Sequence, residues 1–227
     1  TVYGLAGNAY SKRSINNIYK LKKRPKINPL IVHFFNYKNA ENDVVLNDNF
    51  FKLYKKFSPG PITFILKKRF KSKIQPAASA NLNTIAIRFP NHRIVRSILK
   101  KINFPLAMPS ANLSSNVSPV CAEDVVDEFK KNIRFIINGG KSKIGIESTV
   151  IDLTKKPKIL RPGIIGSEII EKILKTKMNI IRKNSKLRSP GMLKKHYSPG
   201  IPIILNQKTS NKKHAFIIFG NKYKNNK

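Results

Sequence analysis

The chain has one cysteine, no tryptophan and few acidic side chains among its 227 residues. Because Cys121 has no second cysteine to pair with, no internal disulfide can form, which is typical of proteins in a reducing compartment. Its neighbours form no Cys-His or zinc pattern, and the four histidines show no metal-ligand spacing. No apolar run is long enough to cross a bilayer, and no signal-peptide pattern opens the chain. These absences predict a soluble cytoplasmic protein without a membrane anchor or a metal site.

The shortage of acidic residues gives the chain an extreme charge. Lys and Arg number 45 and Asp and Glu number 11, so the formal net charge is +34. Such a field attracts nucleic acid, anionic lipid or polyphosphate substrates. However, Lys, Asn and Ile are abundant in every part of the chain, as an AT-rich coding sequence would give whatever the function. The total charge is therefore weak evidence for a nucleic-acid partner, and the local placement of Arg is more informative.

The apolar pattern alternates between helical and strand periodicity along the chain. At roughly 150 residues per domain, the length suits one full core and part of a second. We expect helices over 15–24, 44–57, 94–102, 122–131 and 167–174, the first capped by Ser14 and ended by Pro25, and strands over 30–35, 62–66, 84–89, 105–112, 134–138, 148–153, 158–160, 201–205 and 215–219. Interleaved elements of this kind predict an α/β (α+β) fold, a twisted mixed β-sheet with flanking helices.

The strand over 84–89 places a charged side chain in an apolar setting. Its strict alternation puts Ile85, Ile87 and Phe89 on one face, and Thr84 next to Arg88 on the other. A charged group in so apolar a strand is costly unless it is paired or lines a cleft. Arg88 is therefore a candidate binding residue.

A short basic segment, LKKRPKINPLIVH, runs from Leu21 to His33. It combines Lys22 and Arg24 at a helix end, Asn28 in the following turn and His33 in a strand. Ammonium and guanidinium groups bind oxyanions by charge-assisted hydrogen bonds, so the segment suits phosphate or carboxylate. A solvated Lys-rich helix end, favoured by the helix dipole, explains the same residues equally well.

Polar turns follow several of the predicted strands. The Ser and Asn of Ser110-Ala111-Asn112 could donate to phosphate or ribose oxygens, or could simply form a turn. Glu147-Ser148-Thr149 opens another strand and Arg161-Pro162-Gly163 closes the next, and each motif alone is weak evidence. The chain has no Walker loop, no G-x-S-x-G elbow and no dinucleotide fingerprint. A nucleotide site here must use another architecture.

Taken in order, the motifs TVYGL, KKRPKINPLIVH, SPGPITFILKK, TIAIRFP, MPSANLS, GIESTVIDL, ILRPG and SPGMLKKHYSPG resemble those of the YrdC-like threonylcarbamoyl-AMP synthases. The resemblance runs from Thr1 to about Pro199. It implies a YrdC-like catalytic domain with an open cleft over 1–174, without its N-terminal edge, and a linker over 175–200. Residues 201–227 would then begin a C-terminal Rossmann-like domain, which is truncated here.

The resemblance also implies a reaction in which L-threonine, bicarbonate and ATP give threonylcarbamoyl-adenylate and pyrophosphate, with Mg²⁺ assisting. The product would pass to a threonylcarbamoyl-transferase complex that modifies adenosine in tRNA. Residues at the family's L-threonine positions are Thr1, His33, Arg88, Met108 (by position only) and Ser148. Those at its ATP positions are Arg24, Asn28, Thr84, Ser110, Ser118, Arg161 and Tyr197.

Specific chemical roles follow for three basic residues: Arg88, Lys22 and Arg24. A planar guanidinium can hold a carboxylate by two hydrogen bonds, so Arg88 suits the α-carboxylate of threonine. Lys22 and Arg24 are the expected catalytic residues, because they can offset charge on the triphosphate as the α-phosphorus is attacked. Two other classes of function remain alternatives: a double-stranded RNA or tRNA binding module without catalysis, and a related carbamoyltransferase.

Overall fold

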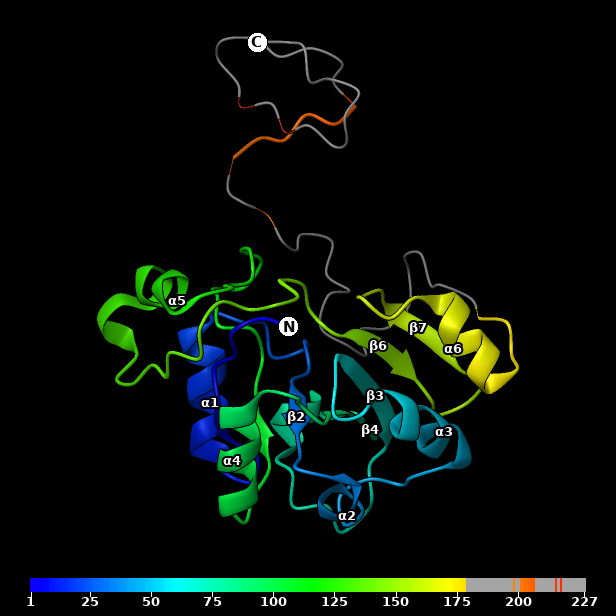
Figure 1. Ribbon diagram of the computed structural model, residues 1–227. Coiled ribbons are helices and arrows are strands. Elements are labelled where there is room, and N and C mark those ends of the chain that lie inside the picture. Colours follow the sequence, from blue (N-terminus) through cyan, green and yellow to red (C-terminus); the bar gives the residue numbers. More distant parts are fainter. Residues whose placement is uncertain (179–197, 199–200, 207–214, 216, 218–227) are drawn as a thin grey trace.

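The computed structural model describes residues 1–178, 198, 201–206, 215 and 217, and its main feature is a mixed β-sheet (Figure 1). In the described part of the chain the sheet has seven strands in the order β1 (Gly7–Asn8), β5 (Leu106–Ala107), β2 (Ile31–His33), β4 (Thr84–Arg88), β3 (Ile62–Lys67), β6 (Thr149–Asp152) and β7 (Lys158–Arg161). The pairs β2–β4 and β3–β6 are parallel, and the other neighbours are antiparallel. The predicted mixed sheet is confirmed.

Six helices in the described residues connect and flank these strands. They are α1 (Lys12–Leu21), α2 (Tyr37–Ala40), α3 (Asp48–Phe57), α4 (Arg93–Lys101), α5 (Ala122–Phe129) and α6 (Ser167–Leu174), with single 3₁₀ turns η1 (Pro76–Ser79) and η2 (Lys130–Asn132). Helix α5 lies apart from α3 and α6, at the other end of the sheet (Figure 1). None of the helices in these described ranges is long and apolar enough to cross a membrane.

One face of the sheet carries the main hydrophobic core. Side chains alternate along each strand, so Ile62, Phe64 and Leu66 share a face. Buried residues of α1, α2, α3 and α6 pack against that face, among them Ile15 and Phe50. Burial of so much apolar area is the main contribution to the stability of the fold.

The opposite face has a smaller apolar cluster beside polar residues. The cluster comprises Ile31, Ile65, Ala86, Val150 and Leu160, and no helix contributes a buried residue to it within the described ranges. Two positions along the respective strands, on the same face by alternation, come His33, Thr63, Arg88 and Ser148. These four side chains define what we call the polar face of the sheet.

The start of two helices differs from the sequence prediction. Ser11, rather than Ser14, caps α1, because its hydroxyl accepts from the Ser14 amide at 3.2 Å. The helix expected from residue 44 begins only after Asn47, whose side chain accepts from the Phe50 amide at 2.9 Å. Val44 instead forms a β-bridge with Lys68.

Three predicted strands are also corrected. Residues 134–138 form no strand, because Ile136 packs on the α5 cluster while Phe135 and Ile137 are exposed. The strand expected over 105–112 is confined to β5, and residues 201–205 form none. Of the strand expected over 215–219 only residues 215 and 217 are described, and most of the linker, with Tyr197, lies outside the described residues.

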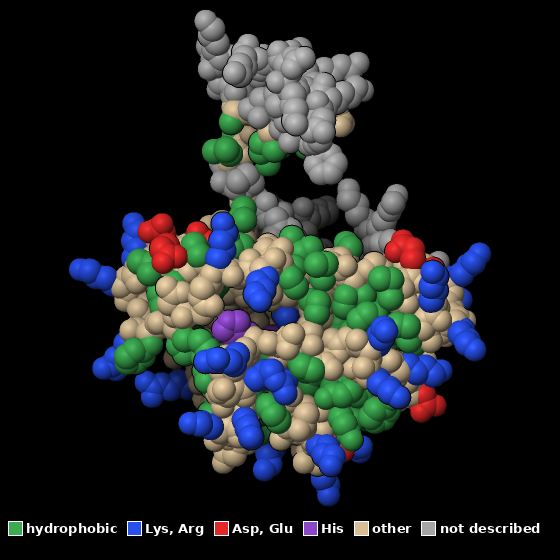
Figure 2. All heavy atoms as spheres, viewed as in Figure 1, with side chains coloured by type: hydrophobic (Ala, Val, Ile, Leu, Met, Phe, Trp, Pro, Cys, Tyr) green, Lys and Arg blue, Asp and Glu red, His purple; other side chains and the backbone are tan. Residues whose placement is uncertain are grey.

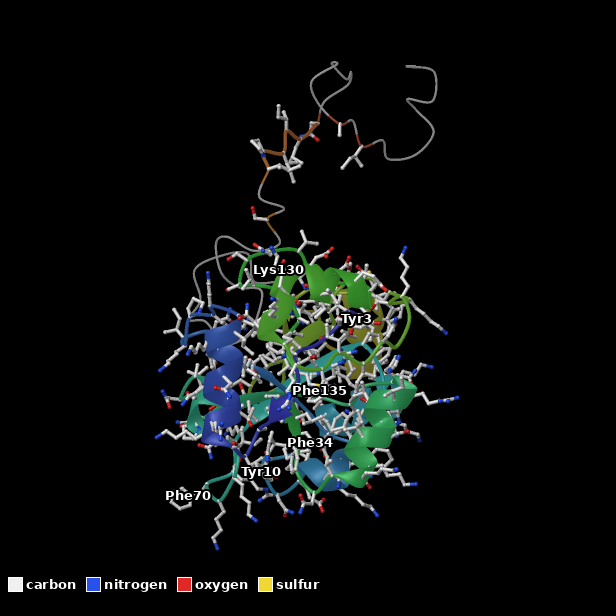
Figure 3. All side chains as sticks on the ribbon, turned by 90° about the vertical axis from the view of Figure 1, so that its left-hand side faces the viewer. Tyr3, Tyr10, Phe34, Phe70, Lys130 and Phe135 are labelled. Carbon is white, nitrogen blue, oxygen red and sulfur yellow. The ribbon has the colours of Figure 1, made fainter. Side chains whose placement is uncertain are left out.

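A buried carboxylate joins three segments at the end of the domain where Tyr10 and Phe70 lie (Figure 3). Asp43 is 1 % exposed and accepts from the Tyr10 hydroxyl at 2.6 Å, the Ser72 hydroxyl at 2.7 Å and the Lys73 amide at 3.0 Å. Burial and this carboxylate raise the pKa of Tyr10, which keeps the hydroxyl protonated as a donor. The cluster fixes the loops that connect the strands at this end.

Candidate functional site

Lys22 is almost completely buried, although it is a lysine at a helix end. Its side chain is 1 % exposed, and Nζ donates to the carbonyls of Ser110 and Asn112, both at 2.5 Å, with Asn112 Oδ1 at 3.4 Å. Burial, followed by the charge of Arg24, lowers the pKa of Lys22 to about 7. The ammonium therefore ties the end of α1 to the turn after β5. The alternative of a solvated helix end is wrong for this residue.

Arg24 and Asn28 form a buried unit beside Lys22. Nη2 of Arg24 donates to Asn28 Oδ1 at 2.7 Å and to the Pro29 carbonyl at 2.8 Å, and Nε donates to the Asn28 carbonyl at 3.0 Å. Burial lowers the pKa of Arg24 to about 10, so the guanidinium stays charged at neutral pH. Nδ2 of Asn28 is buried and has no hydrogen-bond partner within the part of the chain that the structure describes. An unpaired buried donor is costly, and an acceptor on a ligand would satisfy it.

Arg88 lies on the polar face, where sequence alternation placed it. Its Nε donates to the Gly60 carbonyl at 3.0 Å, and Nη1 donates to the Thr1 hydroxyl at 2.9 Å. Burial lowers its pKa to about 10, and the charge of Arg161 acts in the same direction. Thr1 and Arg88, both predicted to hold the same ligand, are thus brought into contact.

His33 lies opposite Arg88 in the β2–β4 register. It is 4 % exposed, and its Nδ1 lies 3.2 Å from the Ile31 carbonyl. Burial, followed by the charge of Arg88, lowers the pKa of His33 to about 3. The imidazole is therefore neutral in the physiological pH range and adds no charge to the site.

Ser148 and Arg161 meet at the start of β6. Arg161 donates through Nη2 to the Ser148 hydroxyl at 3.1 Å and carbonyl at 3.0 Å, and through Nε to the same carbonyl at 3.1 Å. A register shift in the β6–β7 pair sets Arg161 opposite Val150 and Ile159 opposite Ile151. Such bulges re-aim side chains. As a result, two consecutive residues contact the same side of the sheet: Leu160 packs in the apolar cluster with Val150, and Arg161 contacts Ser148.

The sharp turn after Arg161 depends on a glycine. A side chain at Gly163 would collide with the backbone of Thr149. The Thr149 hydroxyl donates to the Ile165 carbonyl at 2.9 Å and accepts from the Ile165 amide at 3.2 Å. The Arg-Pro-Gly turn is therefore packed directly against the start of β6, where Ser148 lies.

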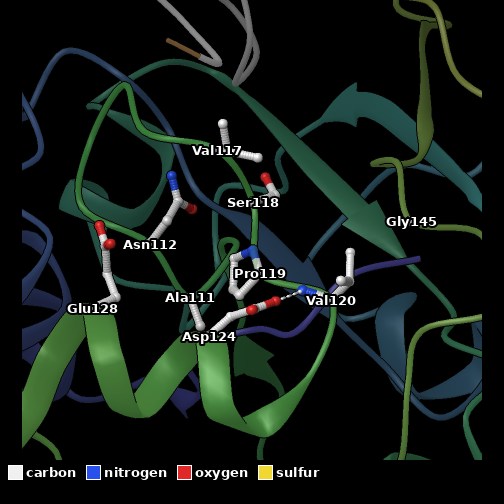
Figure 4. A pocket seen from close by; sticks show the side chains of 9 residues that line it. All are labelled: Ala111, Asn112, Val117, Ser118, Pro119, Val120, Asp124, Glu128 and Gly145. Atoms are coloured by element: carbon white, nitrogen blue, oxygen red, sulfur yellow. Dashed lines mark hydrogen bonds between the residues drawn. The ribbon is translucent and has the colours of Figure 1, made fainter. Parts of the chain in front are cut away.

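Glu147 connects this group to Ser118. One carboxylate oxygen pairs with Arg161 Nη1, and the other accepts from the Ser118 hydroxyl at 3.1 Å. Ser118 also lines a pocket of about 330 Å³ with Asn112, Asp124 and Glu128 (Figure 4). Asp124 and Glu128 project from α5 toward the loop that carries Ser118. The pocket thus adjoins the residues predicted for ATP.

The N-terminal segment lies along the turn that carries Ser110. Gly4 forms a β-bridge with Ser110, and the Ala111 amide donates to the Tyr3 carbonyl at 2.9 Å. The Gly145 amide donates to the Thr1 carbonyl at 3.0 Å, which joins this segment to the loop before Glu147. Parts of the chain from residues 1, 110 and 145 therefore meet at one place.

Two predicted residues lie somewhat apart from these contacts. Thr84 shares a face with Arg88, but Ala86 lies between them, so their Cα atoms are about 13 Å apart at roughly 3.3 Å per residue. The expectation that they are neighbours is wrong. Met108 lies just after β5, and its amide donates to the Ile31 carbonyl at 3.0 Å.

Sequence reasoning missed Thr63 as a member of this arrangement, and it named Asn112 and Glu147 only as parts of polar turns, without the contacts that they make. Each contacts a predicted residue: Thr63 Oγ1 lies 2.7 Å from Ser148 Oγ, Asn112 holds Lys22, and Glu147 holds Arg161. Thr63 carried one available signal, because it is the polar residue in an otherwise apolar run, ITFIL.

Basic side chains on the visible face are spread over many elements, with tan and apolar surface between them (Figure 2). Exposed lysines occur on α1, α3 and α4, among other places. This distribution fits a chain that is basic throughout, and on the described part of this face it singles out no patch for nucleic acid.

Comparisons with known proteins match nearly the whole chain. The family model Sua5/YciO/YrdC, described as “Telomere recombination”, matches residues 1–163, and one described as “Threonylcarbamoyl-AMP synthase, C-terminal domain” matches residues 165–227. The threonylcarbamoyl-AMP synthase of Pyrococcus abyssi is 37% identical over 212 residues, covering 90% of this chain and 62% of that protein. That of Bacillus subtilis is 38% identical over 210 residues, covering 90% and 60%.

A solved structure gives the same result in three dimensions. The crystal structure of P. abyssi Sua5 complexed with L-threonine superposes with a TM-score of 0.83 at 36% identity, covering 87% of this chain and 59% of that one. The chain thus spans about three fifths of the length of these relatives.

Proposed function

Because this chain belongs to the Sua5/YciO/YrdC family, we propose that it acts in the synthesis of threonylcarbamoyl-adenylate from L-threonine, bicarbonate and ATP. Pyrophosphate is the second product. The observation that supports this most is the contact between Ser148 and Arg161, at 3.1 Å. It joins a residue predicted for the amino acid to one predicted for the nucleotide, so the two ligands would bind side by side.

The amino-acid half of the proposed site centres on Arg88. Its guanidinium lies at the end of β4 beside the Thr1 hydroxyl. A guanidinium can hold the substrate carboxylate by two parallel hydrogen bonds, and Ser148 can contribute a third. His33, being neutral, can bind the amino acid without repelling its ammonium group. Met108, just after β5, would contact the ligand through its backbone.

The nucleotide half comprises Arg24, Asn28, Ser110, Ser118 and Arg161. Arg24 is charged and buried, and the free Nδ2 of Asn28 adjoins it. These donors suit phosphate oxygens, and hydrogen bonds from buried charged groups are the strong ones. Lys22 already donates to two carbonyls, so it would serve the phosphates chiefly by fixing the Ser110 turn. Thr84 and Tyr197 remain predictions for the same ligand.

The chemistry needs no strong base from the protein. The amine of threonine and bicarbonate condense to a carbamate with loss of water, and the carbamate is already an anionic nucleophile. Its oxygen attacks the α-phosphorus, the bond to the β-phosphate oxygen breaks, and pyrophosphate leaves. Fixed positive charge from Arg24 and Arg161 would stabilise the charge that develops on the phosphates.

The described residues contain no group of three or more His, Cys, Asp or Glu side chains placed to hold a metal ion. Mg²⁺ would enter as part of the substrate, bound to the triphosphate. Delivery of the product to a threonylcarbamoyl-transferase complex and to tRNA, and the cytoplasmic location, remain predictions.

The test is a pyrophosphate-release assay on the protein that carries this sequence. Release should require ATP, L-threonine and bicarbonate together, and omission of either L-threonine or bicarbonate should abolish it. Release that is indifferent to threonine would overturn the proposal. Binding of double-stranded RNA that weakens steeply with salt, without such release, would favour the RNA-binding alternative, and consumption of carbamoyl phosphate would favour the carbamoyltransferase.

A further inference from the structure

Thr63 places a hydroxyl in β3 among apolar side chains. Its neighbours on β3 are Ile62, Phe64, Ile65 and Leu66, and Thr63 itself is 0 % exposed. A buried hydroxyl is costly unless it is hydrogen-bonded. Its Oγ1 lies 2.7 Å from Ser148 Oγ. Because Thr is branched at Cβ, its side chain is stiff about χ1, so it can hold a partner in a fixed direction.

The hydrogen bonds of Ser148 determine what its hydroxyl can offer a ligand. Arg161 can only donate, so Ser148 Oγ is an acceptor in the contact with Nη2 at 3.1 Å. If Thr63 donates as well, both acceptor positions of Ser148 Oγ are filled. The single proton of Ser148 then remains for a third group, which must be an acceptor.

The location of Thr63 adds a second relationship. Thr63 and Arg88 are directly opposite each other in the antiparallel β3–β4 pair. Opposite side chains on one face of such a pair have Cβ atoms about 5 Å apart. Thr63 thus stands between the guanidinium proposed to hold the substrate carboxylate and the hydroxyl of Ser148.

We propose that Thr63 is a positioning residue for the amino-acid substrate: it donates to Ser148, and so directs the Ser148 proton toward an oxygen of L-threonine. This rests on the proposed function, in which Ser148 and Arg88 bind threonine. The role is specific to the amino-acid half, because Thr63 Oγ1 contacts the Ser148 hydroxyl. The nucleotide residue Arg161 does not depend on that hydroxyl, because the Ser148 carbonyl and Glu147 also hold it.

The experiment compares Thr63→Val, which has the same shape without the hydroxyl, with Thr63→Ser, which keeps the hydroxyl. Threonine-dependent pyrophosphate release is measured for each variant. Thr63→Val should raise KM for L-threonine about tenfold, the effect of losing one hydrogen bond of ordinary strength, and should leave KM for ATP within about twofold. Thr63→Ser should restore KM for threonine to within about threefold of the original value.

A matched control is Thr154→Val, the same change at a hydroxyl that donates to Asp152 at 2.6 Å, beyond the other end of β6. It should leave KM for threonine unchanged. Equal increases in both KM values for Thr63→Val, or no increase at all, would overturn the inference. If the original protein releases no pyrophosphate with threonine, the proposed function fails instead, so the two failures are distinguishable.

A second measurement covers the case in which Thr63→Val does not fold. Calorimetric binding of L-threonine is measured for Thr63→Ala, Ser148→Ala and the double variant. If Thr63 acts through Ser148, the loss of affinity from Thr63→Ala should disappear when Ser148 is already Ala. Additive losses would show that Thr63 acts independently of Ser148, and would overturn the inference.

Discussion

Arg161 and Glu147 form a largely buried ion pair, and each of the two side chains also makes a hydrogen bond to another residue of the site. Their side chains are 6 % and 10 % exposed. Arg161 also holds Ser148 through its hydroxyl and carbonyl, and Glu147 also accepts from Ser118 at 3.1 Å. A negative side chain therefore occupies one edge of the guanidinium that we propose to meet a phosphate.

Replacement of Glu147 should destabilise the fold and increase the stabilisation that bound nucleotide gives. Glu147→Gln leaves Arg161 buried with less compensation, so the free energy of unfolding should fall by about 1–3 kcal/mol. A phosphate group can replace the missing negative charge, so ATP with Mg²⁺ should raise the melting temperature of the variant more than that of the original protein. Thermal unfolding with and without nucleotide checks both statements.

The control for Glu147 is Glu168→Gln, the same change at an exposed carboxylate on α6. It should alter the melting temperature little, in either condition. If ATP stabilises Glu147→Gln less than the original protein, Arg161 does not meet the nucleotide in the way we propose.

Asn28 allows a test of the nucleotide half in which a single hydrogen-bond donor is replaced by an acceptor. Its Oδ1 accepts from Arg24 at 2.7 Å, while the buried Nδ2 has no partner among the described residues. Asn28→Asp keeps the acceptor for Arg24 and replaces the free donor with an acceptor, which would repel a phosphate oxygen. We expect at least a tenfold weaker affinity for ATP. Nucleotide binding by calorimetry measures it.

Two further results bear on the Asn28 prediction. The melting temperature of Asn28→Asp should stay close to the original value, because Arg24 compensates the new charge. Asn36→Asp, at the cap of α2, is a matched control and should leave ATP affinity unchanged. Unaltered ATP affinity in Asn28→Asp would remove this residue from the proposed site.

Arg88 separates the amino-acid half from the nucleotide half. Arg88→Lys keeps a positive charge but loses the two-pronged geometry that suits a carboxylate. KM for L-threonine should rise by at least tenfold, while KM for ATP should change by less than about threefold. Arg93→Lys, at an exposed position on α4, is the control and should change neither value. Equal loss for both substrates would count against the assignment of Arg88 to threonine.

Local sequence patterns predicted the fold and several parts of the site. The alternation from Ile85 to Phe89 correctly placed Arg88 on the face away from the main core. The order of the motifs identified the family, and the family matches confirm that resemblance. These predictions succeeded because they depend on residues close together in the chain or on short motifs.

Contacts between distant segments could not be derived in the same way. The pairing of Glu147 with Arg161 depends on the register shift in β6–β7, which no periodicity indicates. Thr63 looks like an ordinary strand residue until Ser148, 85 positions away, is set beside it. The sequence left open whether Lys22 is a solvated lysine at a helix end, since lysine is usually exposed. Its burial is explained by the carbonyls of residues 110 and 112, which lie far away in the chain.

Lys22 gives the last prediction, which concerns the dependence of stability on pH. Burial holds its pKa in the folded protein at about 7, below the ordinary lysine value of 10.5, so between these two pH values the unfolded chain binds more protons than the folded one. The free energy of unfolding therefore gains a contribution that increases as pH rises above 7. In Lys22→Met, which has a similar length and no charge, this contribution is absent.

The measurement is urea unfolding of the original protein and of Lys22→Met at several pH values from 6.5 to about 9.5. Other lysines titrate in both proteins, so the informative quantity is the difference between their unfolding free energies. That difference should shift in favour of the original protein as pH rises. Lys20→Met, at an exposed position two residues earlier on α1, should show no such shift. Parallel curves for the original protein and Lys22→Met would mean that the ammonium keeps its ordinary pKa, because the Ser110 and Asn112 carbonyls stabilise the charged form fully.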